Sequence, residues 1–297
     1  MNFDNSLVRF VDYIEFVRNF SDNTILSYSR DLKIFSEYLK DNDLDFLNLN
    51  RRDIERFIKE FSQGKFSTVK PSPTTTGRIL ASIKSFYQFL FINGDINELP
   101  TQFVKPPKTR KKLPESLSIK EVQKLLNGFE NRKMDIRNKA IISILYFCGL
   151  RVGELCNLEI RDVDLINSRL IYVKSGKGNK DRNVPINNNC LDNLIEYKQI
   201  RNSFVKNTRN AYFFIGARGD KLSNRSVEKM VDNHALKFLP GKKIHPHIFR
   251  HSCATHLLQR GVNVKIVQEI LGHSNMSTTS IYLHIAGEEK REAINKL

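Results

Sequence analysis

The sequence predicts a mainly α-helical protein of two domains, with one small antiparallel β-sheet in the second domain. Apolar residues recur every three or four positions over most of the chain, and a segment rich in proline and basic residues interrupts this pattern. A chain of 297 residues with 40% hydrophobic residues is long enough to bury two cores. We therefore expect a helical domain over residues 1–103, a linker over 104–116 and a second domain over 117–297.

The first domain is predicted to contain four helices. In residues 23–39 the apolar side chains share one helical face: Ile25, Tyr28, Leu32, Phe35 and Leu39. Asp22 or Asn23 could cap the start of this helix. The other three helices are expected near residues 5–19, 51–62 and 74–93.

In the second domain, helical segments surround a predicted β-hairpin. Ser118 and Glu121 have the spacing of a capping box at the start of a helix, and an apolar helix is expected over 137–148. The runs "LIYV" (170–173) and "NVPI" (183–186) flank a turn rich in Gly and Lys, which is typical of a hairpin. The pattern becomes helical again from about residue 223.

The charge of the chain is concentrated after the first domain. Its formal net charge is +16, yet residues 1–105 hold 14 basic and 14 acidic residues. Residues 117–297 hold 30 basic and 17 acidic residues. Such an excess favours a polyanionic partner such as nucleic acid, and the alternative is a solvated basic surface without a partner.

Membrane and secreted classes are disfavoured. The longest apolar run, at 140–150, is too short to span a bilayer, and the N-terminal residues do not have the pattern of a secretory signal. The four cysteines show no paired spacing: Cys148, Cys156, Cys190 and Cys253. We therefore expect a cytoplasmic protein with reduced cysteines and no membrane partner.

A cluster of histidines raises the possibility of a metal site. Four of the seven histidines lie between residues 244 and 261. On a helix beginning near Pro246, His247, Arg250 and His251 share one face, whereas His256 lies nearly opposite His247. His245 precedes the proline and is biased towards an extended backbone. Because these side chains point in different directions, we expect no metal and no cofactor. Three residues of this segment are expected to act only in packing: His245, Cys253 and His256.

Phosphate ligands are the other interpretation of this segment. "GLRVGEL" (149–155) offers Arg151 and Glu154, and "HPHIFRH" (245–251) offers His247 and Arg250. "LGHSNMSTTSIYLH" (271–284) adds His273 and Tyr282. Taken singly, an arginine is more often a salt-bridge residue, a glutamate can merely brace a helix, and a tyrosine is more often half-buried packing.

Four blocks together resemble the signature of the tyrosine recombinases, or phage integrase family. They are "GLRVGEL", "GKGNKDRNVPI" (176–186), "HPHIFRHSCATHLL" (245–258) and "LGHSNMSTTSIYLH", in that order. The similarity is greatest to the bacterial Xer site-specific recombinases. Residues 21–35 also look like the start of the family's core-binding domain. The resemblance implies an N-terminal SAM-like four-helix domain, followed by a DNA-breaking-rejoining fold.

The resemblance also implies roles for the groups that act on the phosphate. Tyr282 matches the nucleophile, which forms a 3′-phosphotyrosyl link and releases a 5′-hydroxyl. Arg151 and Arg250 match the arginines that hold the non-bridging oxygens. Guanidinium groups suit this role, since the transition state gains negative charge on those oxygens.

The remaining catalytic positions follow in the same way. His247 matches a proton acceptor or phosphate ligand, and His273 matches a second histidine at the phosphate. Lys177 matches the hairpin lysine that protonates the leaving oxygen, although Lys180 is an alternative. Glu154 matches an acidic residue that orients its neighbours. None of these roles requires a metal.

The implied function is site-specific recombination of double-stranded DNA through a Holliday junction, which resolves chromosome or plasmid dimers at cell division. The implied assembly is a homo- or hetero-tetramer on DNA, joined by exchange of a C-terminal helix near 286–297. A second Xer-type recombinase and a DNA translocase are implied partners. Two alternatives stay open: a type IB topoisomerase, which uses similar chemistry, and a DNA-binding protein without catalysis.

Overall fold

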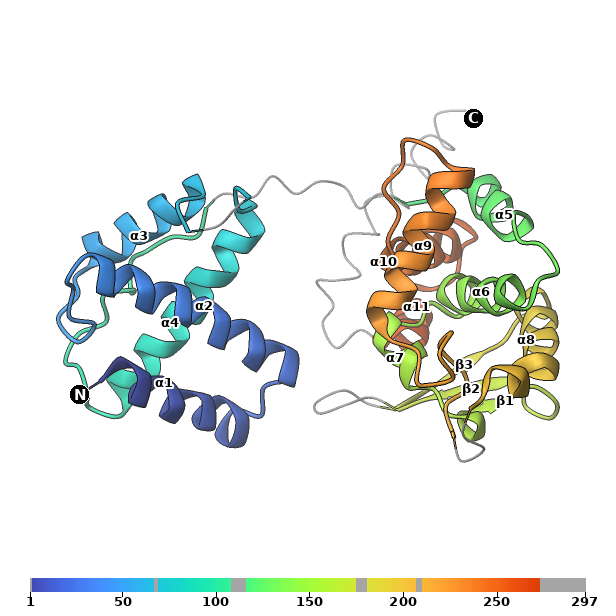
Figure 1. Cartoon of the computed structure of the whole chain (residues 1–297), viewed down its shortest axis with the longest axis horizontal. Coiled ribbons are helices and arrows are strands. Elements are labelled where there is room, and N and C mark those ends of the chain that lie inside the picture. The colour runs from blue at the N-terminus through green and yellow to red at the C-terminus, as the bar shows by residue number, and fades with distance from the viewer. Residues whose placement is uncertain (1, 67–68, 108–115, 175–180, 207–209, 273–297) are drawn as a thin grey trace. The chain divides into compact units, whose positions relative to one another are not determined.

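A computed structural model describes residues 2–66, 69–107, 116–174, 181–206 and 210–272 (Figure 1). The chain folds as two compact units, Met1–Lys112 and Leu113–Leu297. Both units are mainly helical, and the second holds a small antiparallel sheet, so the predicted fold class is confirmed. Within the described ranges, no helix is both long and apolar enough to cross a bilayer.

The first unit contains the four predicted helices: α1 (Phe3–Asp12), α2 (Asp22–Asp41), α3 (Arg51–Gln63) and α4 (Pro73–Ile92). Helix α1 continues into a π-helical turn, Tyr13–Val17. The predicted cap of α2, Asp22 or Asn23, was one or two residues too late. Ser21 has the extended backbone of a cap, and its hydroxyl accepts the Thr24 N–H at 3.3 Å, so Asp22 is already inside the helix.

Aromatic side chains fill the core of the first unit. Phe35 is completely buried and meets the ring of Phe57 edge-on, with 4.9 Å between the centroids. The buried hydroxyl of Tyr87 donates to the Phe46 carbonyl at 2.9 Å. The first unit therefore has a core of its own, built from edge-on aromatic contacts and a buried tyrosine whose hydroxyl is hydrogen-bonded.

The second unit contains the three-stranded antiparallel sheet in the order β1 (Val163–Asp164), β2 (Leu170–Val173) and β3 (Arg182–Pro185). Strands β2 and β3 form the predicted hairpin, with Leu170 opposite Pro185. Strand β1 is only two residues long, which is too short to produce an alternating pattern in the sequence. Tyr172 on β2 is 39% exposed because it lies on the outer face of the strand.

Helices account for most of the second unit: α5 (Ile119–Asn127), α6 (Lys133–Ser143), α7 (Val152–Asn157), α8 (Asn188–Ile200), α9 (Asn224–Phe238), α10 (Pro246–Gln259) and α11 (Val264–Leu271). Helix α6 continues into a π-helical turn, Ile144–Cys148, and 3₁₀ turns cover Ile160–Asp162 and Arg201–Phe204. The predicted capping box of Ser118 and Glu121 opens α5. His234 on α9 stacks on Phe129 with 3.8 Å between ring centroids.

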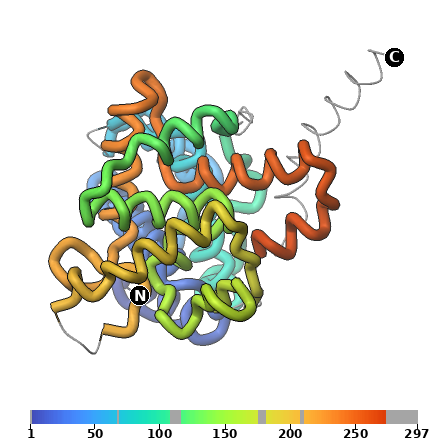
Figure 2. Tube along the Cα trace, turned by 90° about the vertical axis from the view of Figure 1, so that its right-hand side faces the viewer, coloured from blue at the N-terminus to red at the C-terminus, as the bar shows by residue number. Residues whose placement is uncertain are grey.

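Helix α10 is largely buried in the second unit. It begins at Pro246, as predicted, and packs against the π-helical turn Ile144–Cys148 (Figure 2, α10 in orange). Phe249 and Ala254 are completely buried, and buried residues lie all around the helix. Its side chains reach the start of α7 and the end of α11, where the candidate site lies.

Candidate active site

Arg151 follows a turn in which Gly149 takes a left-handed backbone conformation. The π-helical turn after α6 ends at Gly149, whose φ is +60°, and Arg151 then takes the extended backbone of the residue that caps α7. Its backbone N–H and its Nη1 each donate to the carboxylate of Glu154 at 2.8 Å. A carboxylate in the first turn is also favoured by the positive end of the helix.

Glu154 accepts hydrogen bonds from two arginines. Besides the two bonds from Arg151, its oxygens accept Nη1 and Nη2 of Arg182 at 2.9 and 2.8 Å. The side chain of Glu154 is only 12% exposed. Burial alone would raise the pKa of Glu154, but the hydrogen bonds and charges of Arg182 and Arg151 lower it to about 2. Glu154 is therefore ionised at neutral pH.

Arg182 was missed as a site residue by the sequence analysis. It opens β3, is 7% exposed, and also donates its Nε to the carbonyl of Ile270 at 2.8 Å. A signal was present in the sequence, because Arg182 alternates with Val184 and so shares the buried face of the strand. A charged residue on a buried face requires a partner.

Arg250 projects from α10 and is 6% exposed. Its Nη1 donates to the carbonyl of Gly149 at 2.6 Å and its Nη2 to the carbonyl of Leu271 at 2.5 Å. Burial, and then repulsion from Arg151, lower the pKa of Arg250 to about 10. The guanidinium is therefore still charged at pH 7, without a carboxylate among its hydrogen-bond acceptors in the described part of the chain.

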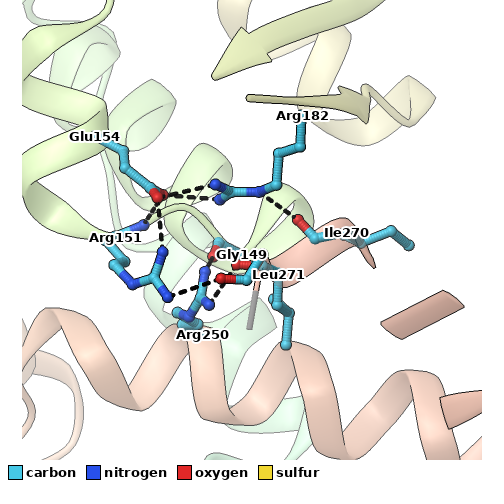
Figure 3. Close-up of polar contacts among 8 residues, drawn as sticks. Gly149, Arg151, Glu154, Arg182, Arg250, Ile270 and Leu271 are labelled. Carbon is cyan, nitrogen blue, oxygen red and sulfur yellow. Dashed lines mark hydrogen bonds and ion pairs between the residues drawn. The ribbon is translucent and has the colours of Figure 1, made fainter. Parts of the chain in front are cut away.

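The three arginines converge on the end of α11 (Figure 3). The carbonyls of Ile270, Leu271 and Gly272 accept from Arg182, Arg250 and Arg151 respectively, the last at 3.0 Å. The final carbonyls of a helix have no partner within it and carry a partial negative charge. This end of α11 therefore offsets part of the repulsion between the three guanidinium groups.

The histidines of α10 lie in different surroundings. His247 is exposed, and partial desolvation together with the charges of His245, Arg250 and Arg151 lowers its pKa. Burial and neighbouring positive groups likewise lower the pKa of His251, which is half-buried. Both imidazoles therefore favour the neutral form near pH 7, in which a ring nitrogen can accept a proton.

The other residues of the histidine stretch do not converge on one point. His256 is buried, and its Nδ1 lies 2.8 Å from the hydroxyl of Tyr146. Cys253 is also buried, which agrees with its predicted packing role. His245 was wrongly expected to pack: it precedes the helix and stays exposed. Among the described residues, no group of three or more His, Cys, Asp or Glu is arranged to hold a metal ion.

Several predicted site residues lie outside the described residues: Lys177, its alternative Lys180, His273, Tyr282 and the segment 286–297. The structure thus brings together Arg151, Glu154, His247 and Arg250 from the predicted set. In the sequence, His273 directly follows Gly272, whose carbonyl accepts from Arg151.

Residues 115–289 match the phage integrase family, and residues 7–94 match the N-terminal SAM-like domain of phage integrases. The chain belongs to the phage integrase family. It is a tyrosine recombinase, an enzyme that cleaves and rejoins DNA strands.

Curated relatives extend over almost the whole recombinase. A tyrosine recombinase of Thermosipho africanus is 38% identical over 295 residues, which cover 99% of this chain and 100% of that protein. Tyrosine recombinase XerD of Staphylococcus epidermidis is 34% identical over 286 residues, 95% of each chain. Tyrosine recombinase XerC of Pelobacter propionicus is 33% identical over 285 residues, 96% of this chain and 92% of that protein.

Solved structures share the recombinase fold. The crystal structure of XerA recombinase is 32% identical and covers 98% of both chains, with a TM-score of 0.55. XerH site-specific recombinase, crystallised with its palindromic difH substrate as a post-cleavage complex, is 24% identical, with a TM-score of 0.77. That comparison covers 93% of this chain and 80% of XerH.

Gly149 provides a test of the turn before Arg151. At Gly149 a Cβ would meet Cδ2 of Leu271 at 2.5 Å, in a backbone region that side chains disfavour. We expect Gly149→Ala to lower the free energy of unfolding by about 2–4 kcal/mol. The matched control is Gly153→Ala, where a Cβ meets only Asn224 at 3.8 Å, and no loss is expected. Urea unfolding followed by circular dichroism measures the free energy of unfolding of both variants. Equal losses in the two variants would contradict the requirement for glycine at position 149.

Glu154 should make stability depend on pH. A carboxyl whose pKa is lower in the folded protein stabilises it above its unfolded pKa, and this contribution is lost as the pH falls through the folded value. With a folded pKa of about 2, Glu154→Gln should cost roughly 3 kcal/mol at pH 7, and the cost should shrink between about pH 5 and pH 2. Urea unfolding at a series of pH values measures this difference.

The control is Glu130→Gln, because Glu130 is 60% exposed and its ion pair with Arg132 lies at the surface. That change should alter stability by less than about 0.5 kcal/mol at every pH. If the loss of stability caused by Glu154→Gln stayed constant down to pH 3, the carboxylate of Glu154 would not be stabilised by ionic bonds.

Proposed function

We propose that this recombinase cleaves DNA by attack of Tyr282 on a phosphate held by Arg151 and Arg250. The observation that carries the proposal is the convergence of these two guanidinium groups in a site with excess positive charge. The cluster holds three arginines but one carboxylate, which accepts only from Arg151 and Arg182, so a phosphate would supply the anion that the site lacks. The hydrogen bonds described for Arg250 use two of its five N–H groups, which leaves donors for phosphate oxygens.

The proton transfers are assigned to groups around this phosphate. His247 accepts the phenolic proton of Tyr282 or donates to a phosphate oxygen, and its lowered pKa supports the first role. His273 contacts the phosphate as a second histidine. Lys177 gives a proton to the leaving 5′-oxygen. Glu154 orients Arg151 through its two hydrogen bonds.

In this scheme the tyrosyl oxygen forms a bond to phosphorus while the bond to the 5′-oxygen breaks. The phosphotyrosyl link keeps the energy of the broken bond, so a 5′-hydroxyl can reverse the step and rejoin strands without ATP. Charge stabilisation comes from arginine side chains, and the scheme involves no metal or cofactor.

We assign the DNA-binding parts by residue range. Residues 1–103 form the core-binding domain, residues 104–116 a basic linker and residues 117–297 the catalytic domain. The net positive charge after residue 105 supports binding of double-stranded DNA along the linker and the catalytic domain.

The biological role that we propose is resolution of chromosome or plasmid dimers at cell division, in the cytoplasm. Relatives named XerC and XerD support this role. Four subunits, of this chain alone or with a second Xer-type recombinase, would exchange two pairs of strands through a Holliday junction. The segment 286–297 would join neighbouring subunits, and a DNA translocase would activate the assembly.

The nucleophile can be tested with DNA that the protein binds in cells, recovered by crosslinking and sequenced. A nicked duplex of such a site should trap a covalent protein–DNA adduct, also in EDTA. Tyr282→Phe should abolish the adduct, and Arg151→Ala or Arg250→Ala should slow its formation by about 10²–10³-fold. Tyr172→Phe is the matched control and should react normally, because Tyr172 is exposed on β2. An adduct formed by Tyr282→Phe would contradict the assignment.

The reaction class can be tested with a supercoiled plasmid that carries two direct copies of the recovered site. We expect excision of the segment between the copies by the wild-type enzyme, together with any partner recombinase bound at the same site, and none by Tyr282→Phe. Product sizes on a gel measure the outcome. Relaxation of a plasmid without the site, without excision, would favour a type IB topoisomerase.

A further inference from the structure

Arg182 is the one arginine of this cluster that the proposed reaction does not use. We propose that Arg182 is a positioning residue, which holds Glu154 so that Arg151 presents its guanidinium to the phosphate with its positive charge available. This inference rests on the proposed function and extends it to a residue whose role there is indirect.

The hydrogen bonds of Arg182 argue against direct contact with DNA. Nη1 and Nη2 donate to the two oxygens of Glu154, and Nε donates to the carbonyl of Ile270. All three nitrogens are thus used, and the side chain is 7% exposed, whereas that of Arg151 is 34% exposed. Arg151 is accessible to a substrate, and Arg182 supports it from the buried side.

The carboxylate is shared evenly between the two arginines. Oε1 accepts one bond from Nη1 of Arg151 and one from Nη1 of Arg182. Oε2 accepts the backbone N–H of Arg151 and Nη2 of Arg182. Without Arg182, Arg151 and Glu154 would form a neutral pair. With Arg182, the three groups carry a net positive charge, and part of it remains on Arg151 for a phosphate.

The backbone at Gly272 also leaves space for the side chain of Arg182. Gly272 has a φ of +64°, and a Cβ there would lie 2.9 Å from Nη1 and 3.0 Å from Cδ of Arg182. The carbonyl of the same Gly272 accepts from Arg151. Arg182 therefore joins β3, α7 and the end of α11 in one network. A lysine could not replace it, because an ammonium group cannot make the paired bonds to a carboxylate and a third bond in a fixed direction.

The test measures single-turnover cleavage of the nicked duplex at saturating protein, and DNA affinity separately. We expect Arg182→Met to slow cleavage by about 100-fold and Arg182→Lys by about 10-fold, with the dissociation constant for DNA within about threefold. The control Tyr197→Phe removes buried hydrogen bonds to Phe213 and Ile215 in another part of the unit. It should lower thermal stability but leave the cleavage rate within about threefold, at a temperature where all variants are folded.

A double-mutant cycle separates positioning from general support of the fold. If Arg182 acts through Glu154, the double variant Arg182→Met/Glu154→Gln should cleave no more slowly than the slower single variant. Additive losses would overturn the proposal, as would normal cleavage by Arg182→Met. Wild type and Tyr282→Phe are run in parallel, so a missing wild-type adduct would count against the proposed function and not against Arg182 alone.

Discussion

The end of helix α11 is the point on which the site depends. Three consecutive carbonyls, from Ile270 to Gly272, each accept a hydrogen bond from a different arginine. Three guanidinium groups brought this close repel one another, and the repulsion is strongest for the buried Arg182 and Arg250. The partial negative charge of the helix end and the carboxylate of Glu154 offset that repulsion, so the cluster can exist before any substrate arrives.

The same contacts hold the second unit together. The arginines come from the start of α7, from β3 and from α10, and all of them reach α11. Gly149 adds a further connection, because its left-handed backbone turns the chain towards Arg151 and its carbonyl accepts from Arg250. A change at any of these contacts should therefore alter both stability and the geometry offered to a phosphate.

Much of the fold could be predicted because helical periodicity is local. Pro246 marked the start of α10, and residues 170–173 and 183–186 marked the hairpin. Arg151, Glu154 and Arg250 were identified by family blocks, yet their partners could not be. The bond between Arg151 and Gly272 joins residues 121 positions apart, and nothing in one sequence specifies such a pairing.

Arg182 shows where the sequence was informative but was interpreted too simply. It was seen as part of a hairpin turn, although its alternation with buried Val184 places it on the inner face. His245 shows the opposite error, since it was expected to act only in packing, yet it stays exposed before the helix. The roles of Lys177, His273 and Tyr282 stay predictions, because these residues lie outside those described.

The electrostatics of the free protein fit the proposal that substrate binding completes the site. Burial and Arg151 lower the pKa of Arg250, which means that its charged form lacks a sufficient counter-charge. In the proposed mechanism, a phosphate oxygen supplies that charge and also relieves the repulsion between Arg151 and Arg250. The relief grows as negative charge builds up on the phosphate during attack, because the donors are already in place and need not reorganise. In the proposed mechanism, the electrostatic cost of holding Arg250 without a carboxylate partner is therefore relieved most fully in the transition state, which lowers the barrier to cleavage.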